Sequence, residues 1–356
     1  MKPEAAVFDC DIHPLPKSAK ALACYLPGKW RDYLDAFGPW TRAPFRGTSS
    51  YPKLTPALAR RDAWPPCGGP PGSDLDFMRV QHLDANNIER GILQPLFPSA
   101  KDQRNPDFGI ALSRAINDWQ VAEWTELEPR LKASIVVPCE DAAASVAEID
   151  ARAAQADFAQ VFMTMRAREP LGERRYWPIY EAAVRHDLPV GIHVGGVTGL
   201  PAASGGWPSY YFEEHQSHPV AAAALVASLI FNGVFEAFPQ LRVICIEASF
   251  GWAPSLCWRL DRQWERLRAE VPHLRRPPSH YIKSNVWFTT QPIEEPSHPQ
   301  FLLDLMEWTG FDRLLFATDY PHWDFDDPRT AIKAPLTDEQ RRMIFSGNAH
   351  ALYRLN

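Results

Sequence analysis

Eight short segments rich in apolar and β-branched residues recur along the chain. They cover residues 5–13, 89–95, 132–138, 158–163, 188–193, 242–247, 285–290 and 314–319. Most are nearly continuous apolar runs, whereas a strand with one face in water alternates between apolar and polar residues. Unbroken apolar runs of this length are typical of strands that are covered on both faces. The pattern therefore predicts eight buried strands.

Segments of helical length separate these strands. They cover residues 75–86, 107–127, 141–154, 173–187, 219–237, 252–270, 296–309 and 337–345, with a terminal piece from Asn348. Strict alternation of strand and helix predicts parallel strands joined by right-handed crossovers. An open doubly wound sheet also fits the alternation, but it more often has a glycine-rich loop after its first strand, and DCDIHPLP is not one. We therefore expect one (β/α)8 barrel domain over residues 1–356.

Two long insertions interrupt the alternation. Residues 14–75 contain eleven prolines and show no sustained periodicity, and residues 195–218 are rich in glycine, serine and aromatic residues. Each insertion follows a strand, the first and the fifth. In a barrel both would emerge at the face formed by the carboxyl ends of the strands, where active sites lie. We expect them to cover the site.

Composition narrows the class of protein. A net charge of −6 and a pI near 6.0 give no electrostatic reason to expect nucleic acid or an anionic membrane as a partner. The longest apolar stretch, residues 220–231, is shorter than the roughly 20 residues needed to span a bilayer. The six cysteines form no C-x-x-C pair, and the first residues have no signal-peptide core. These features predict a cytoplasmic protein.

Candidate metal ligands stand at the ends of three predicted strands. Asp11 and His13 are two residues apart on the first strand, so both side chains point to the same face. His193 ends the fifth strand and Asp319 ends the eighth. Two imidazoles and two carboxylates at one barrel mouth would make a site for a divalent ion with room for water. A single histidine at a strand end is more often structural; the combination is what favours a metal site.

The segments DCDIHP, GIHVGG and FATDYPHWDFDDP resemble the amidohydrolase superfamily, and within it the group that includes aminocarboxymuconate-semialdehyde decarboxylase and γ-resorcylate decarboxylase. The resemblance covers nearly the whole chain. It implies that Asp11 and His13 are the first-strand ligands, His193 the fifth-strand ligand and Asp319 the eighth-strand ligand. It also implies a small carboxylate substrate and a homo-oligomer, a dimer.

The expected cofactor is one divalent ion, zinc first and manganese as the alternative. Binuclear relatives carry a bridging lysine or carboxylate at the fourth strand. In this chain the fourth strand ends with the residues Val161, Phe162, Met163 and Thr164, none of which can take that part. We therefore expect a mononuclear site.

One position departs from the family pattern. Many relatives have a histidine at the end of the sixth strand, where this chain has Glu247. Glu247 can ligate the ion, accept a hydrogen bond from a ligand histidine, or exchange protons with the substrate. Other candidates for acid–base work are Asp319, His218 and His322. His218 can equally be a residue beside a helix cap, and His322 can be a loop residue packed on Trp323.

Further residues are candidates for binding the substrate. Arg166 follows the fourth strand and could hold a carboxylate through two hydrogen bonds. Trp207 and Tyr211 in the second insertion could line a pocket for a flat substrate, although aromatic residues in a long loop often only anchor it. The nearby turn with Asp324, Asp326 and Asp327 could orient a ligand or fix the loop.

Two reactions are consistent with such a centre. The resemblance implies non-oxidative decarboxylation of an aromatic or unsaturated carboxylic acid. Hydrolysis of an ester, amide or lactone by activated water is the alternative, because metal chemistry in an open barrel mouth allows both. A non-catalytic barrel is the third hypothesis, and a missing metal ligand would have been its mark.

Overall fold

The computed structural model describes residues 6–18, 20–38, 53–195 and 205–355. Its eight strands form one sheet in the order β1 to β8, and every neighbouring pair is parallel. The strands are β1 (Val7–Ile12), β2 (Ile88–Leu93), β3 (Leu131–Val136), β4 (Phe158–Thr164), β5 (Val190–His193), β6 (Val243–Ile246), β7 (Val286–Thr289) and β8 (Leu314–Leu315).

Backbone hydrogen bonds also join the first strand to the last. The amide of Cys10 donates to the carbonyl of Phe316 (3.0 Å), and the amide of Asp319 donates to the carbonyl of Asp11 (3.1 Å). A third bond runs from the His13 amide to the Tyr320 carbonyl (2.8 Å). These bonds connect the two ends of the sheet, which excludes the open doubly wound alternative. The predicted (β/α)8 barrel is confirmed.

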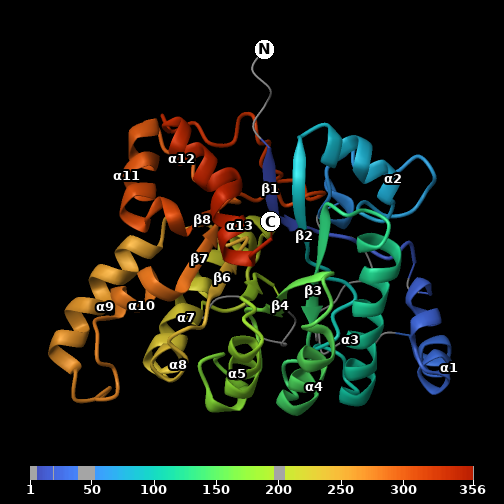
Figure 1. Ribbon diagram of the computed structural model, residues 1–356, viewed down its shortest axis with the longest axis horizontal. Helices are drawn as coiled ribbons and strands as arrows, with labels where there is room; N and C mark the ends of the chain where they lie inside the picture. Colours follow the sequence, from blue (N-terminus) through green and yellow to red (C-terminus); the bar gives the residue numbers. More distant parts are fainter. Residues whose placement is uncertain (1–5, 19, 39–52, 196–204, 356) are drawn as a thin grey trace.

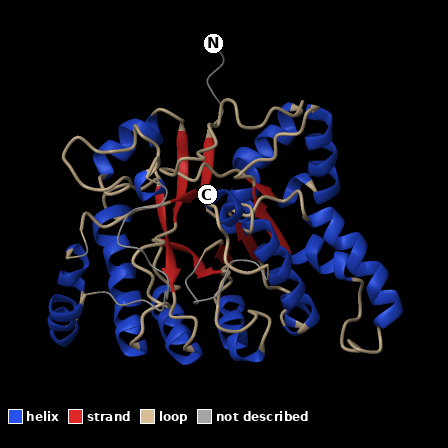
Figure 2. Cartoon of the chain, turned by 180° about the vertical axis from the view of Figure 1, so that it is seen from behind, coloured by secondary structure: helices blue, strands red, loops and turns tan. Residues whose placement is uncertain are grey.

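Helices cover the outside of the strands, as Figures 1 and 2 show from opposite sides. The helices are α1 (Gly28–Phe37), α2 (Leu75–Met78), α3 (Pro106–Gln120), α4 (Ala142–Arg152), α5 (Trp177–Arg185), α6 (Tyr211–His215), α7 (His218–Phe231), α8 (Val234–Ala237), α9 (Ala253–Leu267), α10 (Pro278–Asn285), α11 (Pro299–Thr309), α12 (Asp338–Arg342) and α13 (Asn348–Tyr353). Local sequence fixes several starts: the side chain of Asn105 accepts hydrogen bonds from the first amides of α3, and Asp141 does so for α4. None of the described helices combines the length and the apolar character that a membrane crossing requires.

Four elements differ from the sequence expectation. The helices α1 and α6 lie inside the two segments that were expected to be irregular, and α10 precedes β7 where no helix was expected. Strand β8 is shorter than predicted, since residues 316–319 bond to β1 outside the regular ladder. Asp319 therefore lies on the turn beyond β8. These differences come from tertiary contacts, which hydrophobic periodicity does not report.

Two apolar clusters separate the inside of the barrel from its outer layer. Alternate residues of the strands, including Phe8, Ile244 and Leu315, form the smaller cluster together with Leu352 and Tyr353 of α13. The larger cluster joins the opposite strand faces to the surrounding helices. The last helix thus closes the floor of the barrel, and the polar residues gather at the other end.

An irregularity in β1 aims the site residues at the mouth. Phe8 and Cys10 belong to the inner cluster, and strict alternation would turn Asp11 away from it. The pairing of β1 with β2 shifts register between Asp9 and Ile12. Such bulges re-aim side chains beside active sites. Here the shift turns Asp11, and with it His13, toward the inside of the barrel.

The fully buried carboxylate of Asp9 links three distant segments beneath the mouth. It accepts hydrogen bonds from the Thr318 amide (2.9 Å) and hydroxyl (2.5 Å). His82 Nε2 lies 2.9 Å from the same carboxylate. The Asp11 amide also donates to it (3.2 Å). Asp9 therefore fixes β1 against the segment that carries Asp319.

Replacing Asp9 with alanine is expected to lower the free energy of unfolding by about 3–5 kcal/mol, because several buried donors lose their acceptor at once. Urea denaturation followed by circular dichroism measures this change. Asp35→Ala serves as the control, since Asp35 is 63% exposed and lies 3.6 Å from Lys20; it should shift the free energy of unfolding by less than about 0.5 kcal/mol. Equal stability of the two variants would contradict the structural role of Asp9.

Candidate metal centre

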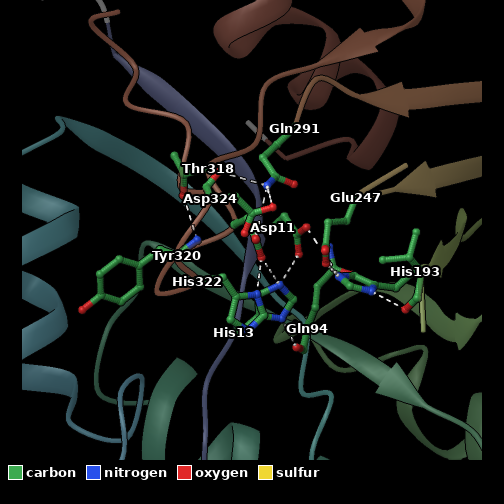
Figure 3. Close-up of polar contacts among 12 residues, drawn as sticks. Asp11, His13, Gln94, His193, Glu247, Gln291, Thr318, Tyr320, His322 and Asp324 are labelled. Carbon is green, nitrogen blue, oxygen red and sulfur yellow. Dashed lines mark hydrogen bonds and ion pairs between the residues drawn. The ribbon is translucent and has the colours of Figure 1, made fainter. Parts of the chain in front are cut away.

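Five ionisable side chains from four strand ends converge at the mouth. They are Asp11 and His13 from β1, His193 as the last residue of β5, Glu247 directly after β6, and Asp319 beyond β8. Figure 3 shows Asp11, His13, His193 and Glu247 close together. All five are buried. The sequence placed each of these residues at the mouth, and the structure brings them together.

Short contacts connect these side chains. His13 Nε2 lies 3.1 Å from Asp11 Oδ1 and 2.8 Å from Asp319 Oδ1. His193 Nε2 lies 3.6 Å from Asp11 Oδ2 and 3.0 Å from Glu247 Oε2. Both imidazoles therefore present the same ring atom, Nε2, to carboxylate oxygens.

The other ring nitrogen of each histidine is held by a backbone carbonyl. His13 Nδ1 lies 2.8 Å from the carbonyl oxygen of Gln94, and His193 Nδ1 lies 2.7 Å from that of Val194. A carbonyl can only accept, so in the neutral ring Nδ1 carries the proton and Nε2 carries a lone pair. This is the arrangement in which metal-binding histidines are usually held.

The lone pair of an imidazole nitrogen and the oxygens of a carboxylate repel each other unless a cation lies between them. Within the part of the chain that the structure describes, Nε2 of His13, Nε2 of His193 and both carboxylate oxygens of Asp11 are buried without a hydrogen-bond partner. Four orphaned atoms at one point are costly in a protein interior unless something binds them. The donor set of imidazole nitrogens and carboxylate oxygens suits Zn²⁺ or Mn²⁺.

The electrostatics of the protein without an ion agree with this interpretation. Burial lowers the pKa of His193, but the nearby charges of Asp11 and Glu247 outweigh it and raise the value to about 10. Burial raises the pKa of Asp11, yet His13 and His193 outweigh it and hold the pKa below its usual value. The carboxylates thus attract positive charge to this point, in the form of a proton or a metal ion.

Glu247 belongs to the centre as closely as the four predicted ligands. Ligand atoms of Asp11, His13, His193 and Glu247 all lie within 4.8 Å of one another. Asp319 joins His13, Glu247 and His322 in an overlapping group with the same limit. Burial, followed by the charge of Asp319, raises the pKa of Glu247. Glu247 can therefore complete the ligand set or hold a proton beside it.

Asp319 is fixed on both of its oxygens. Oδ1 lies 2.6 Å from His322 Nδ1, and the imidazole of His322 stacks on that of His13 with centroids 4.4 Å apart. Oδ2 accepts a hydrogen bond from Gln291 Nε2 (3.2 Å). Asp319 and Glu247 both have positive φ (62° and 55°), a strained backbone conformation that gathers at functional sites. Burial lowers the pKa of His322 to about 4, which favours the neutral form of this ring.

The remaining predicted residues surround this centre. His218 begins α7 with Nδ1 4.0 Å from Glu247 Oε1. Arg166 follows β4, and its backbone carbonyl accepts a hydrogen bond from Lys101 Nζ (2.6 Å). Tyr211 accepts a hydrogen bond from Trp323 Nε1 (2.9 Å), which supports its anchoring role. Trp207 is 52% exposed, and its place in a substrate pocket stays a prediction.

Sequence reasoning missed three residues that hold the centre together. The carbonyl of Gln94 orients His13, and the side chain of Gln291 bridges Asp319 and Asp324. His215 Nε2 lies 3.0 Å from Asp324 Oδ2. The available signals were the position of Gln94 near the end of one predicted strand, the position of Gln291 just after another, and the spacing of His215 from His218.

Comparison with known proteins shows the family of the chain. The sequence model of the family described as "Amidohydrolase" matches residues 8–355. A γ-resorcylate decarboxylase from Polaromonas is 23% identical over 293 residues, covering 80% of this chain and 88% of the relative. A 2-keto-4-carboxy-3-hexenedioate hydratase from Sphingobium is 28% identical over 195 residues, covering 52% of this chain and 51% of the relative.

The fold is also found in solved structures. The 5-carboxyvanillate decarboxylase of Novosphingobium aromaticivorans, crystallised with manganese and 4-hydroxy-3-methoxy-5-nitrobenzoic acid, superposes with a TM-score of 0.75 at 18% identity. The superposition covers 99% of this chain and 97% of the other. At this identity the likeness shows a shared fold.

Proposed function

Because the chain belongs to the amidohydrolase family, we propose that it is a metal-dependent enzyme that removes CO₂ non-oxidatively from an aromatic or unsaturated carboxylic acid. The observation that carries the proposal is the buried cluster of imidazole lone pairs and carboxylates at the barrel mouth. Decarboxylation is favoured over other reactions of the family because the similar proteins include a γ-resorcylate decarboxylase and a 5-carboxyvanillate decarboxylase.

The first part of the mechanism is binding. Asp11, His13, His193 and Asp319 would hold the divalent ion, which when bound supplies a positive charge that orients and polarises the substrate's oxygen atoms. Arg166 would bind a carboxylate of the substrate at the edge of the mouth. Burial of these groups excludes water and strengthens each charge interaction.

The second part is proton delivery. Loss of CO₂ leaves an electron pair on the ring or alkene carbon, and that carbon must receive a proton. Glu247 is the strongest candidate donor, since burial raises its pKa and it lies beside the cluster. His218 Nδ1 lies 4.0 Å from Glu247 Oε1. His322 and Asp319 form a hydrogen-bonded pair, and both offer ligand atoms within 4.8 Å of one on Glu247.

The reaction is tested with carboxyl-labelled 2,6-dihydroxybenzoate and 5-carboxyvanillate as trial substrates. Trapped labelled CO₂ and, in D₂O, one deuterium on the carbon that lost its carboxylate are the expected results. Titration of released acid from ester, amide and lactone substrates tests the hydrolase alternative. Acid release without CO₂ would replace the proposal by that alternative. Inactivity toward every substrate, in protein that holds its metal, would favour the non-catalytic hypothesis.

The purified protein is expected to hold close to one tightly bound divalent ion per chain, zinc or manganese. The reason is that the candidate metal centre at the barrel mouth combines buried carboxylates with two oriented imidazoles. Elemental analysis after gel filtration measures the number. Protein that retains two ions through gel filtration would contradict the mononuclear assignment. We also propose a cytoplasmic location and, from the family resemblance, a homodimer.

A further inference from the structure

A second group of metal-binding side chains lies beside the first. His215 ends α6, His218 begins α7, and Glu247 follows β6. One ligand atom from each of the three lies within 4.8 Å of the other two. Glu247 is the only residue that this group shares with the candidate ligands Asp11, His13 and His193.

One histidine of this group, His215, is held in the way that metal-binding histidines usually are. His215 Nε2 lies 3.0 Å from Asp324 Oδ2, so in the neutral ring Nε2 carries the proton and Nδ1 carries the lone pair. Asp324 is itself held by Gln291 Nε2 (3.3 Å). A carboxylate that fixes the second nitrogen of a histidine is the usual support of a metal ligand.

His218 provides the second, independent observation. Its Nδ1 is buried and has no hydrogen-bond partner among the residues that the structure describes. The nearest carboxylate oxygen, Glu247 Oε1, is 4.0 Å away. That separation is too long for a hydrogen bond. An ion bound at roughly 2.0–2.2 Å from each atom would span it.

The two oxygens of Glu247 point to different histidines. Oε2 is 3.0 Å from His193 Nε2, within the first cluster, and Oε1 faces His218. Figure 3 shows Glu247 alongside His193. A carboxylate in this position can bridge two ions, as in known two-metal sites. From the sequence, a bridging group was considered only at the end of the fourth strand. In the structure, Glu247 at the end of the sixth strand is in a position to bridge.

We propose that His215, His218 and Glu247 form a binding site for a second divalent cation next to the first. The inference goes beyond the proposed function, which needs only the first ion. The second site binds more weakly, because its ligands are two neutral imidazoles and one shared carboxylate, whereas the first also has the carboxylates of Asp11 and Asp319. It therefore fills only when free metal is in excess.

Equilibrium dialysis against increasing free Mn²⁺, with elemental analysis of the protein, tests the site. The wild-type protein is expected to keep about one ion at low free Mn²⁺ and to reach about two at saturation. His215→Gln should stop at about one ion. His218→Gln should do the same, so the result does not depend on one variant. Thermal unfolding of each variant confirms that it is folded.

His186→Gln is the matched control. His186 also pairs with a carboxylate, Asp150 (2.6 Å), but it lies on the outside of the barrel at the end of α5. This variant should still reach about two ions, like the wild type. The second site would be overturned if the wild-type protein saturated at one ion. It would also be overturned if both His215→Gln and His218→Gln still bound two ions. Loss of the first ion would instead overturn the proposed metal centre, so the two failures are distinguishable.

Electron paramagnetic resonance gives a readout that weak surface binding cannot imitate. Two Mn²⁺ ions that share Glu247 should interact magnetically, so the signal of the saturated wild-type protein should differ from the sum of two isolated ions. His215→Gln should show only the isolated-ion signal. A saturated wild-type spectrum that equals the sum of two isolated ions would place the second ion elsewhere and overturn the proposal.

Discussion

Replacement of Asp319 with asparagine is expected to abolish turnover while the barrel stays folded. The side chain is fully buried and stands between His13 Nε2 (2.8 Å) and His322 Nδ1 (2.6 Å). A carboxylate there neutralises the charge of a bound ion and can accept a proton, and an amide does neither well. We expect a loss of about 10³-fold or more in kcat.

The folded state should tolerate this change for two reasons. Asparagine is one of the few residues that accept a positive φ readily, and Asp319 has φ 62°. Gln291 Nε2, which donates to Asp319 Oδ2 (3.2 Å), can donate in the same way to the side-chain oxygen of the new asparagine. Thermal unfolding is expected to change by only a few degrees.

Initial rates, metal content and thermal unfolding measure the outcome of the Asp319→Asn change. Asp327→Asn is the control from the same segment, because Asp327 pairs with Arg329 away from the centre (2.5 Å). The control should keep near-normal turnover. Near-normal turnover in Asp319→Asn would remove Asp319 from the mechanism, and an unfolded protein would show that its role is structural.

Glu247→Gln is expected to give the second largest loss, on the order of 10²-fold or more in kcat. The change keeps the size of the side chain and removes its negative charge and its capacity to hold and release a proton. Burial, followed by the charge of Asp319, raises the pKa of Glu247, so its proton is retained to a higher pH than in an exposed glutamate. Such a group can act as an acid and recover its proton from solvent.

We expect the Glu247→Gln protein to fold and to retain the first ion. Its backbone amide still donates to the Thr289 hydroxyl (3.0 Å), and His13, Asp11 and His193 remain in place. Glu295→Gln is the control, since Glu295 is 61% exposed and pairs with Lys333. If Glu247→Gln turned over normally, Glu247 would be a structural partner of His193 only. His218→Asn would then be the decisive variant, because His218 is the next candidate donor.

Much of the architecture follows from the sequence alone. Eight short apolar runs alternate with helix-length segments, and this alternation is enough to predict parallel strands with helices outside. The spacing of Asp11 and His13, and the positions of His193 and Asp319 at predicted strand ends, placed these side chains at one mouth. Strand periodicity and strand ends are local properties, so a single sequence can show them.

Contacts between distant residues were decided only by the tertiary structure. Asp9 meets Thr318, which is 309 positions further along the chain, because the barrel closes in one particular register. Periodicity tells which face a residue is on, but it does not tell which residue of another strand lies opposite. The register shift in β1 is of the same kind, since it depends on the pairing with β2.

The role of Glu247 shows the same limit at the centre. The sequence placed it at a strand end and left its role open between ligand, hydrogen-bond acceptor and proton carrier. Its positive φ, set by closure of the barrel and the turn after β6, brings one oxygen to His193 and the other toward His218. The meeting of His215 with Asp324, 109 positions apart, likewise required the turn after β8 to pack against α6. The sequence identified the strand-end residues that reach the mouth, and the three-dimensional packing determined which of them touch and which further residues hold them, because contact depends on chain closure and turn conformation.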